Sequence, residues 1–449
     1  MPQQSHARFP NGPVTVASPI LHHGPLPASA DLVVIGGGIA GVTAALDLAN
    51  HGCTVHLVER EKQLGGNFRD VHFTMDGHPA QQYLAALIEQ VENHSNIQLH
   101  VDSAISELAG FVGNFASTIS ANGDGQAVEV EHGAVIVATG AQEIETDEYL
   151  RGQDPRVLTL RELETALAGD DPDMTEKIDS ARSVVFVQCV GSRCTERPYC
   201  SRICCNKSIK NALKLKGRNP DVNVYVLYRD VRAYGVHELA YRQARESGVI
   251  FIRYEEDAKP QVAAENGALT VRVLDPILGR EVVIEADLIA LAVGIEAQSD
   301  NKVLSQMLKV PLNSEGFFLE AHVKLRPVDF ATDGVFVCGL AHYPKDVSEA
   351  VAQARAAAGR AMTVLSKETI EAPGKVSLVR AERCAGCGAC VAVCPFGALE
   401  IDQEKRVAVV NEALCKGCGA CTATCRSGAI DLRGFRDEQL VAAMETVAV

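Results

Sequence analysis

Short apolar runs alternate with amphipathic stretches in the first part of the chain. Residues 31–35 and 54–59 are apolar enough for buried strands, and residues 39–51 between them have helical spacing. A strand, a helix and a second strand over about 30 residues predict a β-α-β unit. Helical spacing returns over residues 83–93, and residues 134–139 predict another buried strand. The pattern predicts an α/β lobe with a parallel sheet.

A second α/β block begins at residue 183. Residues 184–188 and 222–228 predict parallel strands, and residues 207–215 predict the helix between them. Two further buried strands are predicted over residues 287–293 and 334–338. Residues 348–365 are rich in alanine and contain no proline, which predicts a long helix.

The last part of the chain contains an internal repeat. Glu371, Pro373 and Gly374 mark a linker, after which a cysteine-rich module and an acidic helical tail follow. The segment CAGCGACVAVCPFGAL starts at Cys384 and recurs as CKGCGACTATCRSGAI from Cys415, with ten of the 16 aligned positions identical. Two copies of one motif predict a pseudo-symmetric pair of sites.

Composition excludes several classes of protein. The 449 residues carry 42 Lys and Arg against 57 Asp and Glu, and the net charge of −15 argues against nucleic acid and anionic membranes as partners. No apolar run reaches the roughly 18 residues of a membrane helix. The N-terminal segment MPQQSHARFPNGP lacks the apolar core of a signal peptide. We therefore expect a cytoplasmic protein without a membrane span.

Fifteen cysteines point to redox or metal chemistry. An odd number in a long chain without a signal peptide favours such chemistry over disulfides. Thirteen of the cysteines fall into three groups. Cys53 and Cys338 stand alone, and we expect them to be buried apolar thiols.

The first lobe carries a dinucleotide-binding motif. Residues 36–41 read G-x-G-x-x-G between a predicted strand and a predicted helix, and Glu59 stands at the end of the second predicted strand. Glycine allows a tight turn and a close approach to a pyrophosphate, which the helix N-terminus attracts. A carboxylate at the end of the second strand accepts hydrogen bonds from a ribose diol. The expected contacts are Gly36, Gly38, Ile39, Ala40, Gly41, Glu59 and Arg60.

Three further motifs favour FAD over NAD. Leu64-Gly65-Gly66 follows the second strand, Ala138-Thr139-Gly140 ends a later strand, and residues 332–339 read Thr-Asp-Gly-Val-Phe-Val-Cys-Gly. With these motifs, residues 31–365 resemble the two-dinucleotide-binding-domain flavoprotein oxidoreductases. The resemblance implies two Rossmann-like lobes and bound FAD, with an aspartate of the last motif near the ribityl phosphate. It adds Gly65, Gly66, Ala138, Thr139, Gly140, Asp333 and Gly339 to the expected FAD site.

The second lobe departs from that family. Its first predicted turn reads Cys189-Val-Gly-Ser-Arg-Cys194 and contains no second G-x-G-x-x-G. Cysteines thus occupy the place of a pyrophosphate, which counts against NAD(P)H as the direct electron donor. A disulfide reductase is disfavoured because no redox cysteine pair follows Gly66. A self-contained NAD(P)H-dependent flavin oxidoreductase is the alternative function, and a non-catalytic cluster scaffold is a third.

The repeated module matches the bacterial ferredoxin run. Its spacing is C-x2-C-x2-C-x3-C in both copies, which suits a [4Fe–4S] cluster better than zinc. In two-cluster ferredoxins the fourth cysteine of each run ligates the other cluster. We therefore assign Cys384, Cys387, Cys390 and Cys425 to one cluster, and Cys415, Cys418, Cys421 and Cys394 to the other.

The middle group places five cysteines in the short stretch 189–205. They are accompanied by Arg193, Arg197, Arg202 and Lys207, which suit a site of net negative charge. An iron–sulfur cluster is such a site, whereas zinc and free thiols remain the alternatives. The five are Cys189, Cys194, Cys200, Cys204 and Cys205.

A closer family resemblance begins at this group. The segments QCVGSR from Gln188, PYCSRICC from Pro198, RDVRAYG from Arg229 and PKDV from Pro344, with Ala352-Gln353-Ala354, are similar to the heterodisulfide reductase A-subunit family. The resemblance covers residues 31–434. It implies an FAD and iron–sulfur electron-transfer subunit of an oxidoreductase in anaerobic metabolism. It also places Lys345 near the flavin ring, where a cation would stabilise an anionic reduced flavin.

The resemblance implies a third [4Fe–4S] cluster next to the flavin. Its ligands would be Cys189, Cys200, Cys204 and Cys205, with Cys194 in place of Cys189 as the alternative. The implied partners are subunits of the heterodisulfide reductase B and C type, hydrogenase- or formate-dehydrogenase-linked subunits, and quinone-interacting or benzoyl-CoA reductase subunits. Homodimer formation stays open. Electron bifurcation also stays open as a property of the family, and the expected lack of room for the long N-terminal cluster domain and the inserted ferredoxin domain of methanogen members counts against it.

These patterns together predict an α/β protein with a C-terminal α+β ferredoxin domain. We expect an extended arm over residues 1–30 and an FAD-binding domain over residues 31–145 and 291–370. A second Rossmann-like domain with the cysteine-cluster site is expected over residues 146–290. The two-[4Fe–4S] ferredoxin domain is expected over residues 375–434, and the tail over residues 435–449.

Overall fold

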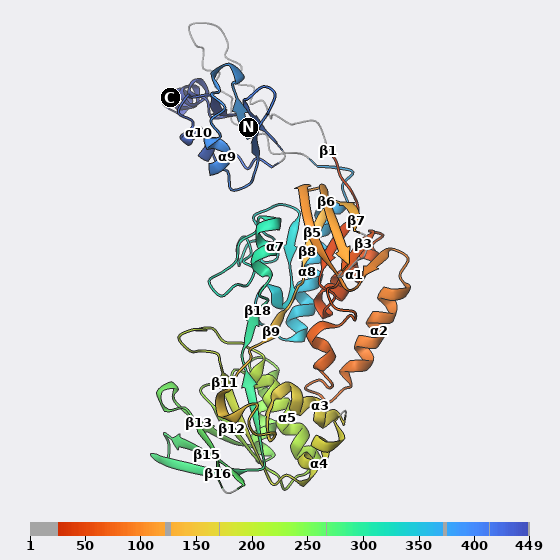
Figure 1. The fold of residues 1–449 in the computed structure, drawn as a ribbon, viewed down its shortest axis with the longest axis vertical. Helices are drawn as coiled ribbons and strands as arrows, with labels where there is room; N and C mark the ends of the chain where they lie inside the picture. The colour runs from red at the N-terminus through yellow and green to blue at the C-terminus, as the bar shows by residue number, and fades with distance from the viewer. Residues whose placement is uncertain are drawn as a thin grey trace, which may run out of the picture. The chain divides into compact units, whose positions relative to one another are not determined.

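The structure, a computed structural model, describes residues 26–121, 127–169, 171–265, 267–370, 375–412 and 414–447. These residues form two compact units (Figure 1). One unit is Ala28–Glu368, and the other starts at Thr369 and includes strand β1 (Leu26–Pro27), which pairs with β20 (Thr369–Ile370). The predicted linker at residues 371–374 and most of the predicted arm lie outside the described residues.

The first lobe of the larger unit is built on a parallel five-stranded sheet. The strand order is β19-β8-β2-β3-β4. Every residue of β2, β3 and β8 is buried, because layers of structure cover both faces of the sheet. The strands are β2 (Leu32–Ile35), β3 (Val55–Val58), β4 (Ile97–His100), β8 (Ala134–Val137) and β19 (Val335–Val337).

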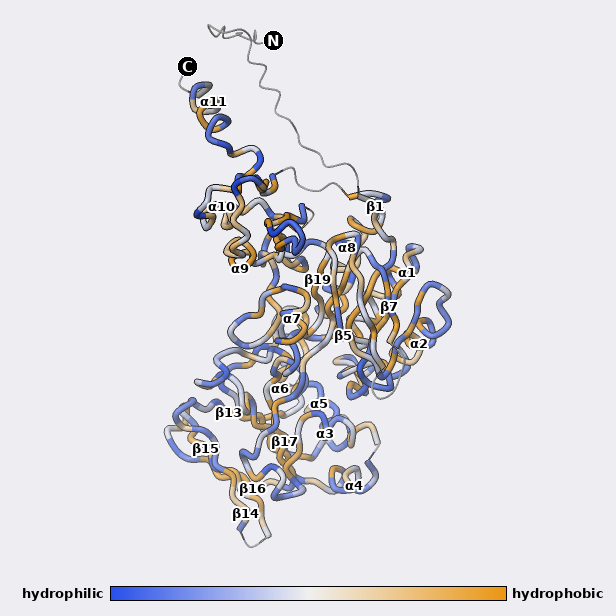
Figure 2. The backbone as a smooth tube through the Cα atoms, turned by 45° about the horizontal axis from the view of Figure 1, so that its top comes forward, coloured by the Kyte–Doolittle hydropathy of each residue, from blue (hydrophilic) through white to orange (hydrophobic). Residues whose placement is uncertain are grey.

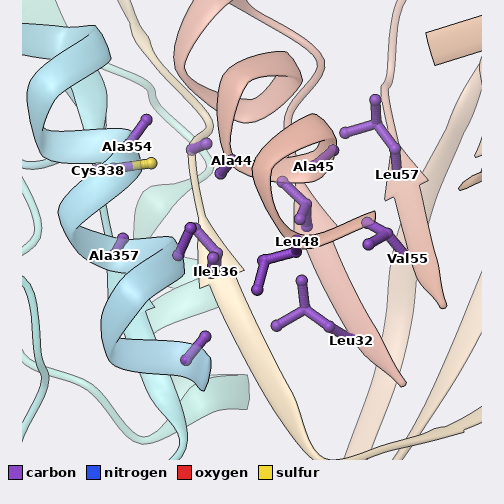
Figure 3. Close-up of a cluster of buried hydrophobic side chains, with 14 of the residues drawn as sticks. Leu32, Ala44, Ala45, Leu48, Val55, Leu57, Ile136, Cys338, Ala354 and Ala357 are labelled. Carbon is purple, nitrogen blue, oxygen red and sulfur yellow. The ribbon is translucent and has the colours of Figure 1, made fainter. Parts of the chain in front are cut away.

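Alternate residues of β2 point to opposite faces of the parallel sheet. Leu32 and Val34 pack against α1 (Ile39–Asn50) and α8 (Val347–Leu365), and Figure 3 shows Leu48 of α1 and Ala357 of α8 around Ile136 of β8. Residues 33 and 35 face the opposite way and pack against an antiparallel sheet of β5 (Ser103–Phe111), β6 (Asn114–Ala121) and β7 (Val128–His132). Helix α2 (Ala80–Asn93) lies beside α1.

The second lobe repeats this arrangement. Its parallel sheet has the order β10-β17-β11-β12-β13, with strands β10 (Val157–Thr159), β11 (Ser183–Val190), β12 (Asn223–Tyr228), β13 (Ile250–Arg253) and β17 (Leu288–Val293). Helices α3 (Leu160–Ala168), α4 (Pro172–Ser180), α5 (Cys204–Arg218) and α6 (His237–Glu246) accompany the sheet. An antiparallel sheet of β14 (Gln261–Glu265), β15 (Ala268–Asp275) and β16 (Arg280–Ala286) packs on the other face.

Two short strands connect the lobes. The chain leaves the first lobe through β9 (Ala141–Glu143) and returns through β18 (Ile295–Ala297), and the two strands pair antiparallel. Helix α7 (Asn301–Leu308) follows β18. Figure 2 shows hydrophobic residues concentrated on inner strands such as β17 and β19, with hydrophilic residues on many of the loops.

The smaller unit contains two copies of one small motif. Strand β21 (Ser377–Val379) pairs with β24 (Ile430–Leu432), and β22 (Leu399–Ile401) pairs with β23 (Ala408–Val410). Short helices α9 (Ala389–Val393) and α10 (Ala420–Thr424) occupy equivalent positions in the two copies, and α11 (Asp437–Val447) ends the described chain. The predicted α/β class with an α+β cysteine-rich module is confirmed.

The structure adds features that the sequence pattern did not predict. Both three-stranded antiparallel sheets were missed, because their strands are half exposed and carry many polar residues. The helix predicted over residues 207–215 starts earlier, at Cys204. Among the helices of the described ranges, none is long and apolar enough to cross a membrane.

Candidate functional site

The glycine loop between β2 and α1 is packed too closely for most side chains. A Cβ atom on Gly36 would lie 2.3 Å from the Ala138 carbonyl oxygen, and one on Gly41 would lie 1.8 Å from the Gly36 carbonyl oxygen. A Cβ atom on Gly38 would meet no atom within 4 Å. The first and third glycines are therefore required by the packing of the protein itself. Gly38 instead faces open space, which suits the close approach of a pyrophosphate to the N-terminus of α1.

Glu59 is fixed beside this loop. Its side chain is buried, and Oε2 accepts a hydrogen bond from the Gly37 backbone N–H at 2.6 Å while Oε1 accepts one from the Glu61 N–H at 2.8 Å. Each carboxylate oxygen keeps a further lone pair for a ribose hydroxyl. The neighbouring Arg60 is half exposed, and its Nη1 lies 3.4 Å from Oδ2 of Asp300, just before α7.

The other predicted segments converge on the same edge of the sheet. The Gly65 N–H donates to the Gly37 carbonyl at 2.8 Å, and a Cβ atom on Gly66 would lie 3.2 Å from the Gly38 Cα. A Cβ atom on Gly339, after β19, would lie 2.8 Å from the Ala40 Cβ. Parallel strands end at one edge of their sheet, where ligands of such folds bind. The structure gathers Gly36, Gly38, Ile39, Ala40, Gly41, Glu59, Gly65, Gly66, Ala138, Thr139, Gly140 and Gly339 at or beside this edge.

Asp333 is not part of this group, which corrects the prediction from its motif. It precedes β19, whereas the glycine loop follows β2, and the two strands run parallel within one sheet. Asp333 therefore lies at the opposite edge from Gly36. Its side chain is 41% exposed and lies 3.6 Å from Arg326 Nη2. The motif identified the strand correctly but placed the ligand at the wrong end of it.

Lys345 lies in a buried position near the end of β19. Its side chain is 7% exposed, and Nζ donates hydrogen bonds to the Gly339 and Tyr343 carbonyl oxygens, both at 2.5 Å. Burial lowers the pKa of Lys345 to about 8, although the nearby Cys338 raises it. Lys345 can therefore gain or lose a proton close to neutral pH beside the last flavin motif.

A cavity of about 520 Å³ opens beside Lys345. His342 lines the cavity and forms hydrogen bonds to two other lining residues. Its Nε2 lies 2.7 Å from Glu320 Oε2, and its Nδ1 lies 2.9 Å from Gln353 Nε2. Burial, helped by the charge of Lys345, lowers the pKa of His342. The sequence patterns missed His342 and Glu320 as site residues, because they come from separate segments without a motif. The lining includes Arg202, Phe318, Glu320, His342, Lys345 and Gln353.

Four of the five middle cysteines lie close enough for the charge of one to affect the pKa of another. They are Cys189, Cys200, Cys204 and Cys205. Burial raises the pKa of Cys204 well above its usual value, and Cys205, Cys189 and Cys200 raise it further. Burial likewise raises the pKa of Cys205 to about 11, with added contributions from residues 189 and 200. Cys194 instead affects Glu196, because the Glu196 backbone N–H and then the Cys194 thiol lower the pKa of that carboxyl. The structure thus groups the four cysteines that the family resemblance selects, with the fifth directed to an acidic neighbour.

Hydrogen-bond donors or the positive end of a helix lie at three of these four thiols. Arg193 Nη1 lies 3.9 Å from Cys189 Sγ, and the Arg202 backbone N–H donates to Cys200 Sγ at 3.3 Å. Cys204 opens α5, where the helix dipole is positive. Burial raises the pKa values of Cys189, Cys204 and Cys205, so these three thiols stay protonated at neutral pH unless a positively charged metal core binds them as thiolates. Such a donor set fits an iron–sulfur cluster.

The loop between β11 and α5 (residues 191–203), called the cysteine loop from here on, contacts the segment that carries Lys345. Arg202 donates to the Pro344 carbonyl at 3.3 Å through Nη1 and to Glu349 Oε1 at 2.6 Å through Nη2. On the other side of Cys200, the Tyr199 ring lies 5.8 Å from the Tyr343 ring between centroids. The predicted cluster site and the predicted flavin site are therefore neighbours within one compact unit.

The cysteines of the two repeats interleave in the smaller unit. Cys394 of the first repeat lines the same small hollow as Cys415, Cys418 and Cys421 of the second. Cys425 packs with Cys384 and Cys390 in the apolar centre of the unit, which Cys394 and Cys421 also join. This arrangement fits the crossed assignment of the fourth cysteines. Cys387 and Cys418, in equivalent positions, are the exposed members of the two sets.

Within the described ranges, no three Cys, His, Asp or Glu side chains form a group that would hold a single metal ion.

Comparison with known proteins defines the class. Residues 30–187 match the pyridine nucleotide-disulphide oxidoreductase family, and residues 377–440 match the 4Fe-4S dicluster domain. The solved thioredoxin reductase of Lactococcus lactis covers 75% of this chain over 99% of its own length, with a TM-score of 0.52 and 15% identity. The thioredoxin reductase of T. acidophilum has a TM-score of 0.50 and 15% identity over the same share of each chain. The larger unit therefore has the fold of a flavin-dependent oxidoreductase, joined to a dicluster ferredoxin domain.

The family follows from two relatives that match almost the whole chain. An iron–sulfur A subunit of the CoB–CoM heterodisulfide reductase of Methanopyrus kandleri is 34% identical, over 93% of this chain and 76% of its own. A protein of Archaeoglobus profundus, named as similar to the heterodisulfide reductase A subunit, is 32% identical over 93% of this chain and 78% of its own. This chain belongs to the heterodisulfide reductase A-subunit family. It is an oxidoreductase subunit that transfers electrons through flavin and iron–sulfur centres.

Proposed function

We propose that the chain carries electrons between one FAD, a flavin-proximal [4Fe–4S] cluster and two ferredoxin-type [4Fe–4S] clusters, as part of a larger cytoplasmic complex. The FAD-binding domain comprises residues 31–145 and 291–370, and residues 146–290 form the Rossmann-like domain that holds the flavin-proximal cluster. Residues 375–434 hold the other two clusters. When bound, these groups exchange electron pairs at the flavin and single electrons at the clusters.

One observation carries the proposal. Arg202 touches Cys200 through its backbone and both Pro344 and Glu349 through its guanidinium. Arg202 thereby links Cys200, one of the four grouped thiols, to the segment that follows the last flavin motif. Electron transfer between a cluster and a flavin requires that the two sites lie close together, whereas a structural zinc site would not need to lie near the flavin.

The protein's own residues prepare the flavin site. Gly36 and Gly41 allow α1 to begin close to the loop, and Gly38 leaves space at the helix N-terminus. Glu59 is held in place to bind a ribose diol. Lys345 keeps a positive charge and an exchangeable proton in a buried position beside Gly339. We propose that this cation faces the flavin ring, where it favours the more negative, reduced form.

The cysteine loop supports a protein partner as the electron donor. In a nicotinamide-binding lobe, the turn after β11 would hold a pyrophosphate at the N-terminus of α5. Here this helix starts with Cys204 and Cys205, which are buried or half-buried. Electrons therefore enter from another protein of the complex. Heterodisulfide reductase B and C type subunits are one choice, and hydrogenase- or formate-dehydrogenase-linked, quinone-interacting or benzoyl-CoA reductase subunits are others.

Electron bifurcation is the more demanding version of this function. A relative from Methanothermobacter marburgensis, 33% identical over 83% of this chain, is named as the A subunit of an H(2):CoB-CoM heterodisulfide,ferredoxin reductase. That name joins two acceptors in one enzyme. Bifurcation by the complex of this chain would require reduction of a low-potential acceptor in fixed stoichiometry with a high-potential one.

The metal and flavin content tests the proposal directly. Anaerobically purified protein should contain about one FAD and about 12 irons, four for each cluster. A reproducible value of about eight irons would remove the flavin-proximal cluster. Rapid bleaching of the flavin by NAD(P)H in the isolated chain would favour the self-contained oxidoreductase instead.

A further inference from the structure

The two repeats of the smaller unit donate matching backbone hydrogen bonds to their cysteines. The Ala398 N–H donates to Cys394 Sγ at 3.4 Å, and at the equivalent place in the second repeat the Ala429 N–H donates to Cys425 Sγ at 3.3 Å. A second matched pair crosses between the repeats. In it, the Ser377 N–H donates to Cys415 Sγ at 3.4 Å and the Ala408 N–H donates to Cys384 Sγ at 3.3 Å.

In the second pair of hydrogen bonds, the two repeats differ in the side chain of the donor residue. Residues 377 and 408 are equivalent, but the first is serine and the second is alanine. Ser377 Oγ lies 3.0 Å from Cys421 Sγ and 3.8 Å from Cys415 Sγ. Ala408 offers no hydroxyl to Cys390, which is the counterpart of Cys421. Both positions are buried, at 2% and 3% exposure, so water does not replace the missing donor.

A hydroxyl close to a cysteine ligand changes the energy of a cluster. When Cys421 is a thiolate ligand it has no proton, so the hydrogen bond runs from the Ser377 hydroxyl to the sulfur. Reduction adds negative charge, part of which lies on the sulfurs, and a donor stabilises the reduced form more than the oxidised form. The interaction is strong because the site is buried.

We infer that Ser377 makes the two ferredoxin-type clusters unequal. It raises the reduction potential of the cluster assigned to Cys394, Cys415, Cys418 and Cys421 above that of its partner. An electron that reaches the smaller unit then resides first on this cluster. The inference rests on the ligand sets of the proposed function, and it adds an order of filling that the repeat alone would not create.

A further hydroxyl opposes this difference. Ser427 Oγ lies 3.6 Å from Cys425 Sγ, a ligand of the partner cluster. The contact is longer than that of Ser377, and it is exposed, so water competes for the same sulfur. We expect Ser377 to dominate.

Three variants test the inference in redox titrations of the anaerobic full-length chain, followed by electron paramagnetic resonance. Ser377→Ala should lower the potential of one cluster and bring the two potentials closer together. Ser377→Thr keeps a hydroxyl and should preserve the separation. Ala408→Ser adds the missing donor and should raise the potential of the other cluster. Iron is measured in each variant, because loss of iron concerns the ligand sets and not the hydrogen bond.

The outcomes distinguish a failure of the hydrogen-bond inference from a failure of the proposed ligand sets. Unchanged potentials in Ser377→Ala and Ala408→Ser at full iron content would overturn the inference and leave the proposed function intact. A wider separation in Ser377→Ala would also overturn it. Wild-type protein with fewer irons than the two ferredoxin-type clusters require would instead contradict the proposed function.

Discussion

Arg202 and Glu349 join the cysteine loop to the first turn of α8, with Arg202 Nη2 2.6 Å from Glu349 Oε1. These residues lie 147 positions apart. The same guanidinium contacts Pro344, the residue before Lys345. This contact holds the loop that carries Cys200 beside the segment after the last flavin motif, and electron transfer between the two sites requires such proximity.

Loss of the Arg202 side chain should disturb the cluster and not only the fold. In Arg202→Ala the ion pair is lost, and both partners are about one-third exposed, so we expect a destabilisation of about 1 kcal/mol. The electron paramagnetic resonance signal of the flavin-proximal cluster should also change. Arg197→Ala is a matched control, because Arg197 lies in the same loop and pairs with Glu296 at 3.0 Å. Equal spectra in the two variants would contradict the role given to Arg202.

Gly38→Ala should separate FAD binding from folding. Gly38 has φ of −69°, which alanine adopts readily, and a Cβ atom there would meet no atom within 4 Å. Alanine therefore fits the fold at this position. The added methyl group enters the space expected for the pyrophosphate, and the affinity for FAD should fall at least about tenfold, or about 1.4 kcal/mol. Gly359→Ala on α8, also without a neighbour within 4 Å, is the control and should retain FAD. Equal FAD affinity in both variants would show that Gly38 does not face the cofactor.

Asp333, at the far edge of the sheet, and Asp329, which lies opposite Phe336 of β19, offer a paired experiment. Asp333→Asn changes a half-exposed side chain at that edge and should leave the FAD content unchanged. Asp329→Asn alters a buried carboxylate that accepts hydrogen bonds from Arg360 at 2.9 to 3.2 Å. It should destabilise the protein by about 2 kcal/mol, measured by urea unfolding. A loss of FAD in Asp333→Asn without unfolding would restore the original prediction.

Lys345 should make stability depend on alkaline pH. Its pKa is about 8 in the folded chain, below the usual value of 10.5. Between these values the unfolded chain holds a proton that the folded chain lacks, so stability rises with pH. The difference in melting temperature between wild type and Lys345→Met should therefore shift in favour of the wild type from pH 8 to pH 10. A constant difference over this range would mean that Lys345 does not titrate there.

Local signals in the sequence predicted the parts of the site that depend on local geometry. Gly36 and Gly41 could be recognised because packing at a strand–helix turn excludes every larger residue. The repeat that starts at Cys384 could be recognised because cluster ligands need fixed spacing. Ser377 carries a weaker signal of the same kind, since the repeat extends back to it and its counterpart in the other copy is Ala408.

Other parts depend on tertiary contacts that no short segment encodes. The pairing of Arg202 with Glu349 requires both lobes to be folded. The motif around Asp333 does not reveal at which edge of the sheet its strand begins. The grouping of Cys189 with Cys204 depends on the register shift near the end of β11 and on the early start of α5. For the middle cysteines, resemblance to a family supplied what spacing alone left open.

The iron content of two cysteine variants tests the flavin-proximal cluster, the central claim, most directly. Cys204→Ala removes the most buried thiol of this proposed cluster, whereas Cys194→Ala removes the fifth thiol, which lies beside Glu196. We predict that Cys204→Ala lowers the iron content from about 12 to about eight per FAD, with the ferredoxin-type signals intact, and that Cys194→Ala retains about 12. Full iron content in Cys204→Ala, or the loss of about four irons in Cys194→Ala, would contradict the proposed ligand set.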